Sequence, residues 1–231
     1  MKTLTCTPFR LSHLASCAAL AASMGMAALA HAAPNFASTL DASAWQVAVN
    51  LRAPDGQASS FQTTVFQPAT TVSWRSSPDL GWLANNASGT NGSVRDWSFF
   101  VFRQAFDLTG FDPSTATLSF QWAADDSGEG FADRGTWVPK FKLNGGNFQT
   151  TQWSGTATYG LSNPVTVNSG FIAGMNVMDF YVEGNGVTDG FALRTLSFTA
   201  TPVPEPESVA LVAAGLVVAG LAARRRGRSA A

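Results

Sequence analysis

Short runs of alternating apolar and polar residues recur along most of the chain, which is the pattern that β-strands produce. The run over 97–108 is apolar on both faces, as expected of a strand at the centre of a sandwich. Asn144-Gly145-Gly146 separates two further runs and predicts a hairpin turn, because Asn and Gly tolerate positive φ. We therefore predict an all-β domain over 33–200, an antiparallel β-sandwich of jelly-roll type. Its predicted strands cover 45–49, 61–66, 70–74, 97–108, 118–122, 137–143, 148–153, 165–167, 177–182 and 191–198.

The N-terminal residues break this alternation and have the organisation of a signal peptide. Lys2 and Arg10 precede an apolar, alanine-rich stretch over 14–29, and Ala30-His31-Ala32 fits the small-x-small cleavage rule. We predict that residues 1–32 are removed and that the mature chain begins at Ala33. The alternative is a lipoprotein box at 14–17, but lipidation requires that box at the end of the apolar stretch and here it lies at the start.

The C-terminal residues form a second apolar segment with a defined polarity. A short linker over 201–207 leads into sixteen uncharged residues, 208–223, and then into a basic tail over 224–231. As a helix, the uncharged stretch measures about 24 Å, compared with a hydrocarbon core of about 30 Å. Snorkelling arginines extend such a span and prefer the cytoplasmic side. The pattern predicts a transmembrane helix over 208–223, with the β domain outside the cytoplasm.

This C-terminal block resembles the PEP-CTERM sorting signal of bacterial exported proteins. Its motif is Val203-Pro204-Glu205-Pro206, its apolar helix follows, and its membrane stop consists of Arg224, Arg225, Arg226 and Arg228. The resemblance implies an exosortase-type processing protease as partner. It also implies an inner-membrane-anchored precursor that is delivered to the cell surface or extracellular matrix. An ordinary C-terminal tail anchor is the alternative.

The composition of the predicted mature domain excludes several kinds of chemistry. Both cysteines and both histidines of the chain lie within 1–32, at Cys6, Cys17, His13 and His31. The domain therefore cannot form a disulfide, a Ser-His-Asp triad, a thiolate nucleophile or a histidine-ligated metal site. Acidic residues outnumber basic ones between Ala33 and Pro202, which argues against nucleic acid as a partner. We predict no catalytic residue and no enzymatic activity.

Part of the domain is similar to galactose-binding-like jelly rolls. The strand over 116–123 runs into Asp125-Asp126, the hairpin turn contains Leu143-Asn144-Gly145, and 171–176 precedes a late strand. In such modules an acidic pair ends one strand, "LNG" closes a hairpin and a "G-x-N" turn comes near the end. The sequence departs from this pattern in the glycine-rich insert over 127–137, so the resemblance supports the fold more than any ligand.

Four carboxylates, Asp125, Asp126, Glu129 and Asp133, lie close together among glycines at this insert. Oxygen ligands in such a loop suit a structural Ca²⁺, which is the one cofactor that we consider. A solvated acidic turn is the alternative. The same residues raise the possibility of glycoside hydrolysis, but neighbours such as Asp125 and Asp126 point to opposite faces of an extended chain and make a poor catalytic pair.

Three tryptophans are candidates for stacking on sugar rings. Trp82 lies in a predicted loop, and Trp137 and Trp153 lie near the ends of predicted hairpin strands. Each is equally compatible with the sandwich core, where aromatic residues supply much of the buried area.

The sequence thus predicts an exported, exosortase-processed surface or matrix protein with a non-catalytic β-sandwich, associated with the exopolysaccharide of a biofilm or floc. The first alternative is a carbohydrate-binding module with a defined glycan ligand. The second is a carboxylate-dependent glycan-cleaving enzyme.

Overall fold

The computed structural model describes residues 32–51, 60–67, 80–87, 98–125, 139–153, 160–184, 189–204 and 206–228. Residues Ala33–Val203 form one compact unit, and the helix α2 (Pro206–Arg228) belongs to a second one. Within the first unit a 3₁₀ turn, η2 (Ala42–Ala44), precedes the strands. These are β1 (Trp45–Leu51), β2 (Gln62–Thr63), β3 (Val65–Gln67), β4 (Trp82–Ala84), β5 (Ser98–Asp107), β6 (Phe111–Asp125), β7 (Lys140–Leu143), β8 (Gln149–Thr150), β9 (Val165–Val167), β10 (Met175–Gly184) and β11 (Gly190–Pro202).

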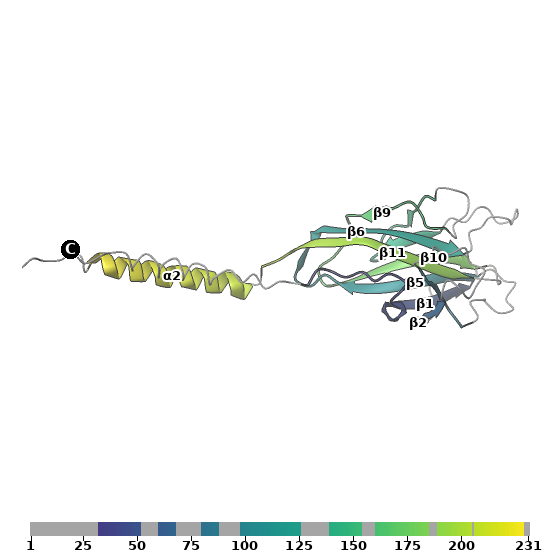
Figure 1. Cartoon of the computed structure of the whole chain (residues 1–231), viewed down its shortest axis with the longest axis horizontal. Helices are drawn as coiled ribbons and strands as arrows, with labels where there is room; N and C mark the ends of the chain where they lie inside the picture. The colour runs from purple at the N-terminus through teal and green to yellow at the C-terminus, as the bar shows by residue number, and fades with distance from the viewer. Residues whose placement is uncertain are drawn as a thin grey trace, which may run out of the picture. The chain divides into compact units, whose positions relative to one another are not determined.

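The strands form two antiparallel sheets that pack as a sandwich (Figure 1). The first sheet, sheet A, has the order β2-β1-β5-β10-β7-β8, and the second, sheet B, has the order β3-β4-β11-β6-β9. The predicted β-sandwich is thus confirmed, and it is consistent with a jelly-roll-like module. The predicted hairpin turn is also confirmed: β7 pairs with β8, and Asn144 has a φ of 52° within the turn.

The longest ladder, between β6 and β11, defines the two ends of the sandwich (Figure 1). At one end Pro202 pairs with Phe111, beside the tight turn at Gly110, which has a φ of 82°. We call this the exit end, because the chain leaves the β unit there. At the opposite end Gly190 pairs with Asp125. The acidic residue Asp125 therefore lies at the far end of the ladder from the predicted sorting motif.

The core between the sheets consists mainly of aromatic rings. Phe180 of β10 is completely buried, and its ring lies 4.9 Å from the ring of Phe191 and 5.2 Å from that of Trp122, both in sheet B. Edge-to-face and tilted contacts of this kind stabilise a core beyond the area that they bury. The largest fully buried side chains are Trp45, Trp82, Trp122, Phe100, Phe102, Phe120, Phe141, Phe180, Phe191, Leu83, Leu108 and Leu118. Of these, Trp82 packs in a separate small cluster with Ala84, Ala123 and Ala192.

Two strand predictions need correction. The run over 61–66 forms two strands, because the chain crosses from sheet A to sheet B at Thr64, whose hydroxyl donates a hydrogen bond to the Ala42 carbonyl at 3.0 Å. The segment around Trp82, predicted as a loop, is strand β4. With three residues, β4 is too short to show a period. The predicted strand over 70–74 lies outside the described residues.

We expect Phe180→Ala to lower the free energy of unfolding by about 3–5 kcal/mol, because it removes a ring that bridges both sheets and leaves a cavity. Urea denaturation of the full chain would measure the loss. Leu196→Ala is the control, since this side chain of β11 is 46% exposed, and its effect should stay within about 0.5 kcal/mol. Equal losses for the two variants would contradict the assignment of Phe180 to the core.

Candidate functional site

The predicted sorting motif follows the last strand with almost no spacer. Strand β11 ends at Pro202, and the next residue, Val203, donates a backbone hydrogen bond to the Gly110 carbonyl at 2.8 Å. Helix α2 then begins at Pro206, a residue type suited to the first helical position. Glu205 lies outside the described residues. Val203 is therefore held by the β unit, while Pro206 already belongs to the helix.

Helix α2 includes the predicted apolar segment and carries its apolar side chains exposed. Leu211 is 77% exposed, Leu216 69% and Val218 66%. Arg224 and Arg225 are exposed near the C-terminal end, where positive charge is favourable to the helix dipole. Arg226 and Arg228 belong to the same helix by their backbone.

Measured by length and hydropathy, none of the helices in the described ranges qualifies as a membrane span. The segment 208–223 is helical, because it lies within α2. Its transmembrane role stays a prediction.

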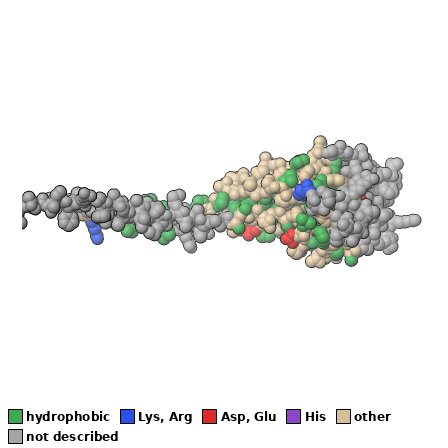
Figure 2. All heavy atoms as spheres, viewed as in Figure 1, with side chains coloured by type: hydrophobic (Ala, Val, Ile, Leu, Met, Phe, Trp, Pro, Cys, Tyr) green, Lys and Arg blue, Asp and Glu red, His purple; other side chains and the backbone are tan. Residues whose placement is uncertain are grey.

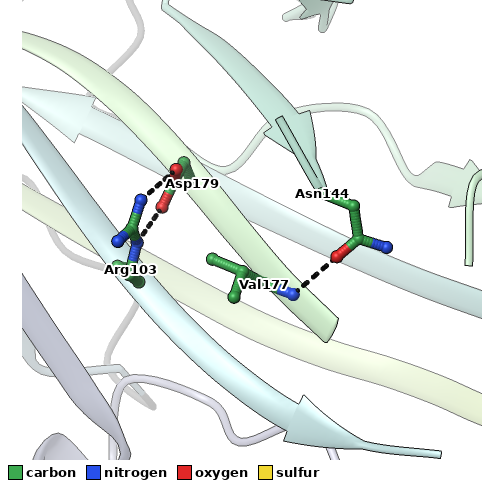
Figure 3. A network of polar contacts seen from close by, with 4 residues as sticks. All are labelled: Arg103, Asn144, Val177 and Asp179. Carbon is green, nitrogen blue, oxygen red and sulfur yellow. Dashed lines mark hydrogen bonds and ion pairs between the residues drawn. The ribbon is translucent and has the colours of Figure 1, made fainter. Parts of the chain in front are cut away.

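At the exit end, two asparagines join the motifs that resemble the galactose-binding-like modules. Asn144 of the hairpin turn donates to the Asn176 side-chain oxygen at 2.8 Å. It also accepts a hydrogen bond from the Val177 backbone N–H at 2.9 Å (Figure 3). Asn176 is fully buried, and its amide also donates to the carbonyls of Ile172 and Gly174, both at 2.8 Å. These motifs therefore have a structural role: they fasten two loops to each other.

On the outer face of sheet A, Arg103 of β5 and Asp179 of β10 form a bidentate ion pair (Figure 3). Arg103 Nε lies 2.6 Å from Asp179 Oδ1, and the second guanidinium nitrogen lies 2.7 Å from Oδ2. The hydrogen bonds to Asp179 raise the pKa of Arg103, although burial opposes this. The guanidinium also lies 3.9 Å from the centre of the Phe61 ring.

A second cation–aromatic cluster lies on the same face, across the next strand. The Lys142 ammonium lies 3.8 Å from the centre of the Phe148 ring and 5.6 Å from that of Tyr181, and Lys140 lies 5.2 Å from the Phe148 ring. The two rings meet edge to face at 5.0 Å. We call Lys140, Lys142, Phe148 and Tyr181 the lysine–aromatic cluster. Among the described side chains on the visible face of the β unit, Figure 2 shows few charged ones.

Sequence reasoning identified neither arrangement. A signal was nevertheless present, because Arg103 and Asp179 are charged residues with large apolar residues around them in their strands. A charge in such a strand indicates a partner on a neighbouring strand. The pairing of β5 with β10, which the sequence does not state, identifies that partner.

The predicted calcium ligands are mostly outside the described residues. Asp125 is the last residue of β6 and is half-buried, while Asp126, Glu129 and Asp133 are not among the residues that the structure describes. Within the described ranges, no three acidic, histidine or cysteine side chains gather as metal ligands would. The calcium site stays a prediction.

The three candidate stacking tryptophans have different outcomes. Trp82 is 1% exposed and packs with Ala84, Ala123 and Ala192, so it presents no ring face to a sugar and its predicted role is wrong. Trp153 is half-buried: its ring lies 5.3 Å from that of Trp122, and its indole N–H donates to the Gly160 carbonyl at 3.1 Å. Trp137 lies outside the described residues, as does the cleavage-site residue Ala30, whereas Ala32 is the first residue described.

Comparison with protein families identifies the C-terminal segment. Residues 202–226 match the PEP-CTERM protein-sorting motif, so the match begins at the last residue of β11 and covers nearly all of α2. The chain carries this motif, as its sequence predicted. The motif implies that the chain is an exported protein, processed by an exosortase and sorted to the cell surface.

No curated protein matches the chain. Among solved structures, the GH31 alpha-xylosidase from Xanthomonas citri is 9% identical over 71% of this chain, with a TM-score of 0.30. The chain spans 14% of the length of that structure. A likeness this low carries no argument about activity.

We expect Asn176→Ala to destabilise the β unit by about 1–3 kcal/mol, because it removes the hydrogen bonds of a fully buried amide to the Ile172 and Gly174 carbonyls and to the Asn144 side chain. Chemical denaturation would measure this change. Asn147→Ala is the matched control, since Asn147 is exposed in the same hairpin region. If both variants unfold at the same denaturant concentration, the two-asparagine connection does not support the exit end.

Proposed function

We propose that the protein is a non-catalytic surface or matrix protein whose β-sandwich associates with extracellular polysaccharide after exosortase processing. The observation that carries this proposal is the junction at Val203. The sorting motif starts where the folded unit stops. Cleavage near Pro204 to Pro206 would therefore release a β unit that retains every strand from β1 to β11 in the described part of the chain.

We further propose that α2 holds the precursor in the inner membrane until processing. The supporting observation is its set of large apolar side chains, which are mostly exposed to solvent in the chain alone. Exposed apolar surface of this kind indicates contact with a membrane or a partner. The arginines at 224–228 would stay on the cytoplasmic side.

Two observations support the absence of catalysis. Between Ala33 and Pro202 the sequence contains no histidine and no cysteine. Several described carboxylates are also engaged locally. Hydrogen bonds from Thr109, led by its side chain, lower the pKa of Asp107, and those from Ser114 act likewise on Asp112. Asp179 is paired with Arg103. The lowered pKa values of Asp107 and Asp112 keep these two carboxylates ionised, which makes them poor general acids.

The alternative of a carbohydrate-binding module has one observation in its favour. The outer face of sheet A combines aromatic rings with cationic side chains, which suits both stacking and polar contacts to sugars. No described residue favours the third possibility, a glycan-cleaving enzyme, whose predicted carboxylates lie chiefly in 126–138.

The sorting proposal predicts that protein recovered from the cell surface ends near Pro206. Peptide mass spectrometry of surface and membrane fractions from the native host would show this. A Pro204→Ala, Pro206→Ala double variant should accumulate in the inner membrane, because the protease no longer recognises its motif. Thr199→Ala, an exposed change in β11 upstream of the motif, serves as the control and should be processed normally. Surface protein that still contains Arg224 to Arg226 would refute the proposal.

The purified full chain should also hydrolyse no common ester, peptide or glycoside substrate. Reducing-end and chromogenic assays would test this after repeated purification. Activity that persists through purification and disappears in Asp125→Asn or Asp126→Asn would identify the protein as an enzyme. Activity that both variants retain would point to a contaminant, because these are the carboxylates that the hydrolase alternative requires.

A further inference from the structure

We propose that the lysine–aromatic cluster on the outer face of sheet A is a binding site for an anionic polysaccharide, with Lys142 as the residue that recognises carboxylated sugars. This inference rests on the proposed function, because it names the ligand class and the site for the polysaccharide association. The ligand would be a polyuronate, a glycan with a carboxylate on its repeating sugar.

The argument begins with the register of sheet A. Asp179 lies opposite Arg103 on one side and opposite Lys142 on the other. One carboxylate thus has two cationic neighbours, each one strand away, or about 4.8 Å. Arg103 and Lys142 could therefore each form an ion pair with Asp179.

Arg103 takes both oxygens of that carboxylate. Its planar guanidinium matches the carboxylate with two parallel hydrogen bonds, which a lysine ammonium cannot do. The side chain of Asp179 is only 9% exposed, so it is committed to this pair. Within the described part of the chain, Lys142 has no carboxylate partner, and its ammonium contacts the rings of Phe148 and Tyr181 instead.

The ammonium of Lys142 therefore packs against the rings of Phe148 and Tyr181 and is partly accessible to solvent. Lys140, Lys142 and Phe148 are all half-exposed, whereas Tyr181 is buried beneath them at 9% exposure. Glu183 shares this face of β10, but it is 4% exposed and offers little charge to solvent. The accessible charge of the cluster is therefore positive, although the domain as a whole is acidic.

A carboxylated sugar matches this arrangement in charge and shape. Its carboxylate would form charge-assisted contacts with the ammonium of Lys142, supported by Lys140, and the apolar face of its ring would lie on Phe148. A neutral glycan would leave the charge unpaired. Lys140, Lys142 and Tyr181 lie on strands of sheet A, and Phe148 directly precedes β8, so the sheet holds the groups of the site in place before binding.

Binding of the full chain to polygalacturonate, in a non-ionic detergent, would test the proposal, with neutral dextran as the reference polymer. We expect the wild-type chain to bind polygalacturonate and not dextran, and added salt to weaken the binding by screening. Lys142→Met keeps the stem on the rings and removes the charge. It should weaken binding about tenfold, as expected for a charge-assisted contact, and leave the melting temperature unchanged.

The matched control removes one positive charge from the other sheet. Arg194→Gln in β11 is half-exposed on sheet B and should bind polygalacturonate as the wild type does. Equal weakening in both variants would show that binding follows overall charge, and full binding by Lys142→Met would show that the cluster is only packing. Either result overturns the site, as does a wild-type chain that does not bind. If the protein is nevertheless processed and reaches the cell surface, only this inference fails and the sorting proposal stands.

Discussion

The aromatic contact between the two sheets is the interaction on which the rest of this structure depends. Without cysteine between Ala33 and Pro202, the β unit has no disulfide to stabilise it, and it must gain its stability by burying rings. Phe180 shows how this works, because it meets Phe191 and Trp122 across the sandwich and Phe141 within its own sheet. Because these rings must be buried between the sheets, they determine which face of each sheet points inward and which side chains point outward.

At the exit end, hydrogen bonds hold the β unit in place up to its last residue, Val203, where the sorting segment follows. Asn144 and Asn176 form a network of short hydrogen bonds, which holds the loops beside the Gly110 turn. Gly110 in turn accepts the hydrogen bond of Val203. Folding and sorting thus share residues 202 and 203, and the order within the β unit continues up to the motif that a protease would recognise.

The outer face of sheet A shows how backbone pairing distributes charge. Two cationic side chains, Arg103 and Lys142, lie opposite one carboxylate, Asp179, and guanidinium geometry assigns that carboxylate to Arg103. Lys142 is left to the rings of Phe148 and Tyr181. A difference in shape between two cations of equal charge therefore decides which one is available to a ligand. Arg103 contributes to stability, while Lys142 contributes to the proposed binding surface.

The sequence by itself determined the fold class, the hairpin at Asn144 and the sorting motif, because each depends on residues that are close together in the chain. Period-two alternation, a left-handed turn and a Pro-Glu-Pro segment are local properties. What the tertiary structure decided depends on distant residues. It placed Trp82 in a short strand and buried it, divided 61–66 between two sheets, and joined Asn144 to Asn176. It also paired Arg103 with Asp179 rather than leaving that carboxylate to Lys142. Alternation states which residues share a face, but only the order and register of the strands decide which of them touch.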